Sequence, residues 1–161
     1  MSAYFKILFA VLISLFMCDF SKAGNIEDGD AAVLKNDYVL ALKKYKLAAL
    51  ENDAIAQYRI GQMYSQGVGL AQNFSEAKKW YKLAAEQGHP SAQYNLALRY
   101  TKRGDQNFKL AYMWSTLSAS AGDIEARELR NLVASLMTAP KITEAKKSAQ
   151  ECKIRNFKNC D

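Results

Sequence analysis

Apolar side chains recur along this chain at intervals of three and four residues. Positions i, i+4 and i+8 are apolar in two segments that lie 36 residues apart: Ala56, Ile60, Tyr64 and Ala92, Leu96, Tyr100. Residues spaced in this way lie on one face of an α-helix. Each segment is therefore predicted to be a helix that buries one stripe of its surface.

A second helical pattern follows each of these segments. It mixes bulky and small side chains, as in Ala77, Tyr81 and Ala84. Small residues allow two packed helices to approach each other closely. Gly61 and Ala97 occupy matching positions in the two first helices, and we expect the helices of each pair to cross there.

These two helical patterns form a unit that the chain repeats. The stretch KYKLAALENDAIAQY, residues 44–58, aligns with WYKLAAEQGHPSAQY, residues 80–94. A more degraded copy, WSTLSASAGDIEARE, occupies residues 114–128. Helical spacing inside a period of this length predicts stacked helix-turn-helix units, each of which buries one face on its neighbour.

The residues that end and begin the helices fit the same organisation. Asn52, Gly88 and Gly122 stand at equivalent positions after the second helix of each unit. Glycine, and after it asparagine, adopts the left-handed conformation that ends many helices. Ser75 is predicted to be the N-cap of the second helix in the middle unit, with Glu76 in its first turn.

Residues 54–93, AIAQYRIGQMYSQGVGLAQNFSEAKKWYKLAAEQGHPSAQ, resemble the Sel1-like repeat, a relative of the tetratricopeptide repeat. That pattern reads A-x-x-x-L-G-x-x-Y-x-x-G-x-G-V, followed by K-A-x-x-W-Y-x-x-A-A-x-x-G. In the third copy, Ala97 replaces the glycine and Ser115 replaces the tyrosine. The first copy keeps mainly its second helix. The resemblance implies an all-α fold, a right-handed α/α solenoid of antiparallel helix pairs with C-terminal capping helices.

We expect the following division of the chain. Residues 24–122 should form three repeats at about 26–52, 53–88 and 89–122. Residues 123–161 should form a C-terminal cap, with a final helix that begins at about Thr143.

The first 23 residues differ in composition from the rest. Lys6 precedes an apolar stretch of 11 residues, 7–17, and small residues follow before Ala23. This pattern predicts a secretory signal peptide cleaved after Ala23, because the apolar stretch is shorter than the roughly 20 residues that span a bilayer. An uncleaved anchor and a lipoprotein site at Cys18 are the alternatives. The expected location is periplasmic or secreted, with no integral membrane segment after cleavage.

Charge and cysteine content agree with export. Without residues 1–23, the chain has 20 basic and 15 acidic side chains, and the basic residues are scattered, so we expect no nucleic-acid partner. Cys152 and Cys160 are then the two remaining cysteines and are predicted to form a disulfide. On one helix they would lie about 12 Å apart, so the chain must turn back, with Asn156 as the expected turn. Two free thiols are the alternative.

No enzyme site is predicted. Ser75 and Lys78 match the S-x-x-K motif of penicillin-interacting enzymes, but the chain has no Ser-Asp-Asn or Lys-Thr-Gly partner. Thr143 and Lys146 show the same spacing, and we expect both motifs to be helix starts. His89, the only histidine, is expected to be a solvated turn residue, so neither a metal site nor a cofactor site is expected.

Function therefore rests on surface residues that the repeat leaves free. We expect a partner-binding site on the concave face, where first helices line such stacks, made by Arg59, Gln62, Asn95 and Arg99. The resemblance implies a non-catalytic, exported module, a monomer that binds a protein in the cell envelope or outside the cell. The alternatives are an ordinary solvated face, a binder of a cell-wall or saccharide ligand, and a β-lactam-hydrolysing enzyme.

Overall fold

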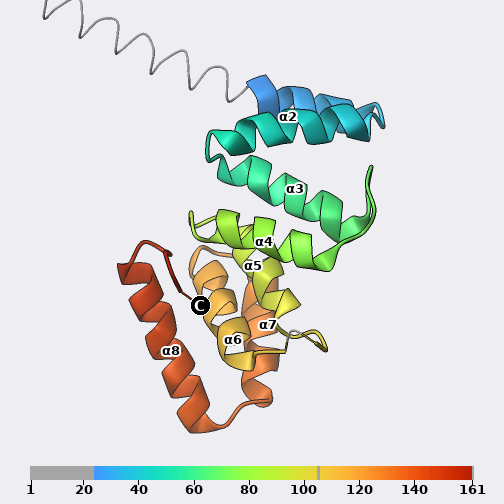
Figure 1. Cartoon of the computed structure of the whole chain (residues 1–161). Helices are drawn as coiled ribbons and strands as arrows, with labels where there is room; N and C mark the ends of the chain where they lie inside the picture. Colours follow the sequence, from blue (N-terminus) through green and yellow to red (C-terminus); the bar gives the residue numbers. More distant parts are fainter. Residues whose placement is uncertain (1–23, 105, 161) are drawn as a thin grey trace, which may run out of the picture.

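The computed structural model in Figure 1 describes residues 24–104 and 106–160 as helices joined by short loops. These residues contain no strand, and their helices stack in chain order from α2 at one end to α7 at the other. This arrangement confirms the all-α solenoid. No helix within the described ranges combines the length and the hydropathy that crossing a membrane requires. The predicted signal peptide, residues 1–23, lies outside the described residues.

Residues 24–34 form the first described helical segment. The following helices are α2 Tyr38–Leu50, α3 Ala54–Gln66, α4 Phe74–Ala85, α5 Pro90–Arg99, α6 Phe108–Ser120, α7 Ile124–Ser135 and α8 Ala139–Ile154. Each of α2 to α6 packs against the next helix along the chain. Helix α8 departs from this order, because it packs against α6, which lies between α7 and α8 (Figure 1).

The first repeat is more complete than the sequence indicates, because residues 24–34 supply its first helix. A Cβ atom on Gly29 would lie 2.5 Å from Cε1 of Tyr45, and one on Gly61 would lie 2.6 Å from Cδ1 of Tyr81. The two pairs are therefore equivalent, although Gly29 and Tyr45 are 16 residues apart and Gly61 and Tyr81 are 20 apart. The expectation that the first copy keeps mainly its second helix was wrong, since only its connecting loop is shortened.

Small and bulky residues alternate in the core, as expected. The side chains of Ile60, Leu96 and Trp114 are fully buried. Trp80 is only half-buried and packs against the N-terminal part of the core, the cluster that contains Tyr45. The two tryptophans thus occupy unequal environments, although the repeat places them at equivalent positions.

The structure corrects both predicted helix starts. Helix α4 is capped by Asn73, whose Oδ1 accepts a hydrogen bond from the amide of Glu76 at 3.0 Å, and Ser75 is an exposed residue in its first turn. Asparagine caps a helix as well as serine does, and here it comes first along the chain. Helix α8 begins at Ala139, so Thr143 lies inside it and donates its hydroxyl hydrogen to the carbonyl of Ala139.

The predictions for the helix ends and for the C-terminal turn are confirmed. Asn52, Gly88 and Gly122 have φ values of 59°, 83° and 96°, which confirms their left-handed conformation. Cys152 and Cys160 form the predicted disulfide with Cα atoms 5.1 Å apart. The chain turns back at Asn156, whose φ is 51°.

The segment between the cysteines returns to the middle of the stack (Figure 1). The ring of Phe157 lies so close to Gly88 that a Cβ atom there would be 3.0 Å from Cε2 of the ring. Gly88 ends the second repeat, whereas Phe157 follows the last helix. The disulfide-closed tail therefore fastens the end of the chain to the turn between α4 and α5.

Candidate functional site

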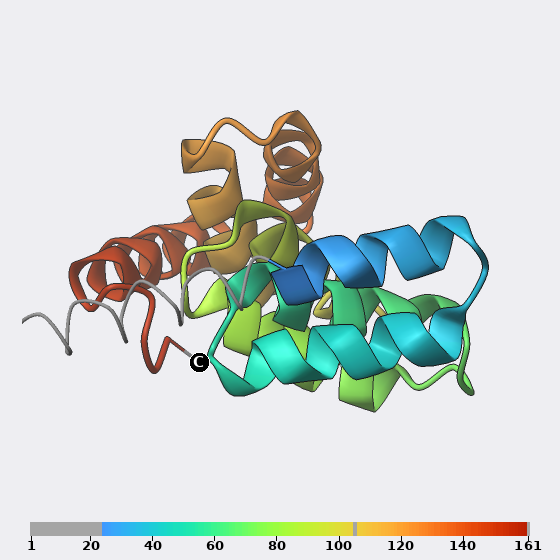
Figure 2. The same ribbon diagram turned by 90° about the horizontal axis from the view of Figure 1, so that it is seen from above.

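A groove of about 470 Å³ opens between the helical segment 24–34 and α3. Figure 2 shows from above that this segment runs beside α2, with α3 beneath them. Apolar side chains form much of the groove: Val33, Leu34, Met63 and Val68. Polar side chains complete its lining: Asp30, Tyr45, Arg59, Gln62 and Gln66. Leu34 is 86% exposed, so an apolar side chain is fully available at its rim.

One end of the groove holds a fixed pair of charges. The hydroxyl of Tyr45 donates a hydrogen bond to Oδ1 of Asp30 at 2.6 Å, and Nε of Arg59 lies 3.3 Å from the same oxygen. Burial raises the pKa of Tyr45 above its usual range, and the hydrogen bond to Asp30 raises it further. Tyr45 therefore remains a neutral hydrogen-bond donor, and the carboxylate is shared between it and the guanidinium.

The polar side chains continue along α3. Nη1 of Arg59 donates to Oε1 of Gln62 at 3.4 Å, and Nε2 of Gln62 donates to the hydroxyl of Tyr58 at 2.9 Å. Two of the predicted site residues, Arg59 and Gln62, thus lie together in the groove. Arg59 is nevertheless engaged by Asp30, whereas the sequence treats it as a free surface cation.

The other two predicted site residues, Asn95 and Arg99, belong to α5 and do not line this groove. Nδ2 of Asn95 donates to the carbonyl of Ser91 at 2.8 Å. The guanidinium of Arg99 lies 4.1 Å from the centroid of the Phe74 ring, a cation–π contact. Arg99 stands 36 residues after Met63 and occupies the equivalent, inward-facing position, which explains why its side chain packs against the protein.

His89 is not the solvated turn residue that the sequence predicts. It is the N-cap of α5, and its Nδ1 accepts a hydrogen bond from the amide of Ala92 at 3.3 Å. Its ring stacks on that of Tyr58 with centroids 4.7 Å apart. Burial lowers the pKa of His89 below its usual range. The imidazole is therefore held neutral, as a helix cap beside α3.

The two S-x-x-K side chains have different surroundings. Ser75 is exposed in the first turn of α4. The ammonium of Lys78 lies 4.6 Å from the centroid of the Tyr100 ring. Within residues 24–104 and 106–160, no group of three or more histidine, cysteine or acidic side chains is placed to hold a metal ion.

Sequence reasoning missed one wall of the groove, namely Asp30, Val33 and Leu34. The missing signal was the pair Gly29 and Tyr45, which repeats the contact of Gly61 and Tyr81 at a shorter spacing. A search at a fixed offset of 36 residues does not detect it, because the loop in the first unit is four residues shorter. Allowing the loop to vary would have located the first helix and the residues that it contributes.

Comparison with known proteins identifies the repeat. The model of the Sel1 repeat family matches residues 23–53, 54–89 and 90–123. A solved structure of c5321, described as a protective antigen in uropathogenic Escherichia coli strains with an SLR fold, matches with a TM-score of 0.76 at 23% identity. A Sel1 repeat protein from Oxalobacter formigenes matches with a TM-score of 0.55 at 35% identity. None of the curated proteins matches the chain.

The two solved structures are longer than this chain. The match to c5321 covers 84% of this chain and 31% of that one. The match to the Oxalobacter formigenes protein covers 59% of this chain and 40% of that one. The first of these likenesses concerns the fold alone.

Proposed function

The chain belongs to the Sel1-repeat family, and we propose that it is an exported, non-catalytic module that binds an extended segment of a protein partner. The binding site is the groove between residues 24–34 and α3. Proteins of this family are generally interaction modules without catalytic activity.

The observation that carries the proposal is the composition of the groove. Its apolar side chains, with Leu34 at the rim, offer contacts for apolar side chains of a bound segment. Gln66 offers a carboxamide group, which both donates and accepts hydrogen bonds and so matches a peptide backbone. Gln62 is bonded to Arg59 and Tyr58, and its second amide hydrogen and second lone pair remain for a bound segment. An extended peptide needs this combination, because its backbone must be hydrogen-bonded while alternate side chains are buried.

The ionisable groups of the groove support a binding role over a catalytic one. Tyr45 donates a hydrogen bond to Asp30 and Arg59 forms an ion pair with it, so the carboxylate of Asp30 is already engaged by two groups of the protein. The pKa of Tyr45 is raised, which keeps the hydroxyl protonated and makes it a poor nucleophile. The same three groups are well suited to hold the two helices that form the groove at a fixed separation.

The disulfide between Cys152 and Cys160 supports export, because such bonds persist in oxidising compartments. We place the protein in the periplasm or outside the cell, after cleavage of residues 1–23. Mass spectrometry of the protein isolated from its natural cells tests this. An N-terminus at Gly24 is expected, a retained Met1 would contradict cleavage, and a lipid-modified Cys18 would identify a lipoprotein.

The groove is tested with residues 24–161, which contain all the described helices, as an affinity bait in envelope extracts. Leu34→Glu places a charge at the groove rim on an exposed side chain, so the fold should be unaffected. Ile154→Glu is the matched control, because Ile154 is 80% exposed on α8, away from the groove. The same protein should be captured by the parent and the control but lost from the Leu34→Glu variant.

Two results would count against this site. Partner capture that survives Leu34→Glu would place the binding surface elsewhere. Retention of the parent by purified cell-wall material, with no protein captured, would favour the alternative of a cell-wall or saccharide ligand.

A further inference from the structure

Helix α2 has a basic and apolar face that is exposed in the described structure. Val39 and Leu50 are 76% and 84% exposed at its two ends, and Lys43 and Lys46 are exposed between them. These residues are spaced by three and four positions and so lie on one side of the helix. A groove of about 470 Å³, also lined by Leu47, runs along this side. The helix contains no acidic residue.

Helix α7 has an exposed face of opposite charge. Ile124, Leu132 and Leu136 are 61%, 62% and 58% exposed. Glu125 and Glu128 are exposed among them, and Glu128 stands four residues from both Ile124 and Leu132.

Acidic side chains at this end of α7 act on Tyr94 of α5. The pKa of Tyr94 is raised, first by burial and then by Glu125, Asp123 and Glu128. The helix also carries Arg127 and Arg130. Arg130 donates to Oδ1 of Asn131 and lines a different hollow, against α6 and α8.

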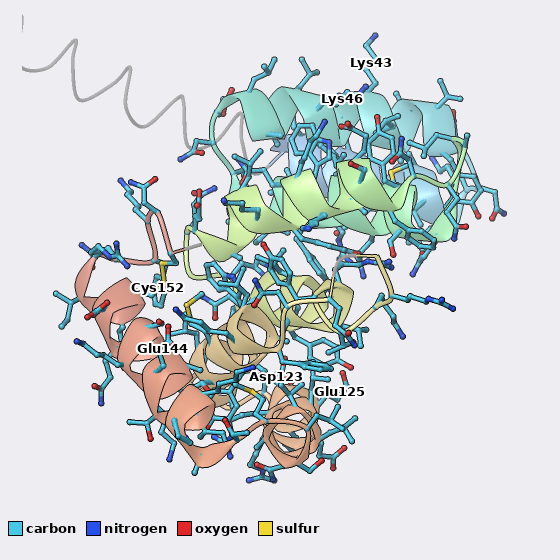
Figure 3. All side chains as sticks on the ribbon, turned by 60° about the horizontal axis from the view of Figure 1, so that its bottom comes forward. Lys43, Lys46, Asp123, Glu125, Glu144 and Cys152 are labelled. Carbon is cyan, nitrogen blue, oxygen red and sulfur yellow. A yellow bond between two sulfur atoms is a disulfide. The ribbon has the colours of Figure 1, made fainter. Side chains whose placement is uncertain are left out.

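The two faces lie at opposite ends of the molecule. In Figure 3, Lys43 and Lys46 of α2 lie on the far side of the stack from Glu125 of α7 and from Asp123, which caps α7. Figure 1 shows the same separation between the two helices. The chain therefore cannot bring its own α2 face onto its own α7 face.

We propose that the α2 face of one copy of this chain packs against the α7 face of a second copy, so that the solenoids associate head to tail. Both faces present apolar side chains, and the lysines of one match the glutamates of the other. A second copy is the occupant that these observations favour, because one molecule carries both complementary surfaces. Such a contact is heterologous, so each bound copy leaves one face of each kind open and the association can continue.

The expected association is weak and depends on salt. Helices α2 and α7 have 13 and 12 residues, which corresponds to a contact about 20 Å long. One helix packed on another of this length buries less surface than a stable, specific interface of about 1,600 Å². The charges are exposed, so added salt screens their attraction. Dilute samples should therefore be monomeric, as the sequence predicts, and concentrated samples should not.

Sedimentation velocity of residues 24–161 over a concentration series tests the proposal. The average sedimentation coefficient should rise with protein concentration at low salt, and the rise should diminish at high salt. A sedimentation coefficient that keeps the value of the monomer at every concentration overturns the proposal. A dimer that does not grow further also overturns it, because a closed pair is not a head-to-tail contact.

Charge reversal provides a sharper test. Lys43→Glu with Lys46→Glu makes both faces acidic, and Glu125→Lys with Glu128→Lys makes both basic. Each variant alone should associate at least about tenfold more weakly than the parent, which corresponds to about 1.4 kcal/mol, because like charges then meet. A mixture of the two variants should associate again, since each acidic face then meets a basic one. Failure of the mixture to recover overturns the proposal.

The matched control is Lys102→Glu with Arg103→Glu, which reverses two exposed cations in the loop after α5. The control should associate as the parent does, and helical dichroism should be equal in all variants. The last measurement is binding of the protein to vesicles that contain anionic phospholipid. A parent that stays monomeric but binds these vesicles, and loses that binding in the Lys43→Glu, Lys46→Glu variant, would identify the α2 face as a membrane-contact surface and overturn the proposal.

Discussion

The ring of Tyr81 fills the space that a side chain on Gly61 would need. A Cβ atom at Gly61 would lie 2.6 Å from Cδ1 of the ring, closer than two carbon atoms that are not bonded to each other can approach. The third repeat resolves the same crossing differently, with Ala97 opposite the equivalent position Ser115. Bulk on one helix is thus matched by the absence of bulk on the other.

Gly61→Ala should lower the free energy of unfolding by about 1 kcal/mol. The added methyl group overpacks the crossing, at a typical cost of 1–3 kcal/mol. The higher helix propensity of alanine offsets about 1 kcal/mol of this cost. Urea denaturation measures the difference. The control is Gly24→Ala, because a Cβ atom at Gly24 meets nothing within 4 Å, and it should not destabilise the protein.

The effect of Gly61→Ala on the free energy of unfolding should change sign when the Tyr81 ring is absent. In a Tyr81→Ser background, Gly61→Ala should stabilise the protein, because the overpacking has been removed and the gain in helix propensity remains. Equal destabilisation in both backgrounds would show that the Tyr81 ring does not set this requirement for glycine.

Asn73→Ala should destabilise the protein by about 1 kcal/mol, because it removes the side chain that caps α4. Ser75→Ala should change the free energy of unfolding by less than about 0.5 kcal/mol, since Ser75 is exposed and makes no cap. Thermal denaturation of both variants under the same conditions measures this. If Ser75→Ala destabilised the protein more than Asn73→Ala, Ser75 rather than Asn73 would be the cap of α4.

Stability should fall as the pH is lowered from about 7 to 5, partly because of His89. The folded state holds the pKa of His89 below its ordinary value near 6.5. Below pH 6.5 the unfolded chain therefore binds more protons than the folded one, and the linked free energy favours unfolding. Above that pH the imidazole is neutral in both states. Melting temperatures measured across this range should show the decline.

His89→Asn is the control for this effect, because asparagine caps a helix but does not titrate. Its melting temperature should vary less between pH 7 and 5 than that of the parent. An identical pH dependence in the variant would assign the decline to other groups.

Replacement of Cys152 and Cys160 by serine should lower the free energy of unfolding by about 2.5 kcal/mol, the chain-entropy value for so short a loop. Denaturation of the parent in reductant should give the same loss. Phe157→Ala retains the disulfide and removes the packing of one partly buried ring on the core and on Gly88, so its effect should be smaller. A parent that is equally stable in reductant would contradict the expected role of the bond.

The parts of the fold that follow local rules could be predicted from the sequence. The left-handed conformation of Asn52 and the turn at Asn156 depend on the intrinsic preferences of single residues. The buried stripe through Ile60 depends on helical spacing alone. Asn73 and Ser75 are both capping residues, and they lie so close together that composition does not decide between them.

The candidate site was less predictable, because its residues are defined by distant partners. Arg59 is a free cation by its place in the repeat, and only the folded chain brings Asp30 within 3.3 Å of it. Arg99 likewise packs on Phe74 through a tertiary contact. Gln62 differs from these two, because the residues that it contacts, Tyr58 and Arg59, lie within about one helical turn of it.

The contact between Phe157 and Gly88 changes how the molecule should come apart. A stack whose units touch only their neighbours can fray from either end, one unit at a time. Here the last helix cannot leave without withdrawing Phe157 from the turn between α4 and α5. Hydrogen exchange should therefore find the amides of α8 opening together with those of α5 and α6, while the segment 24–34, at the other end, opens alone.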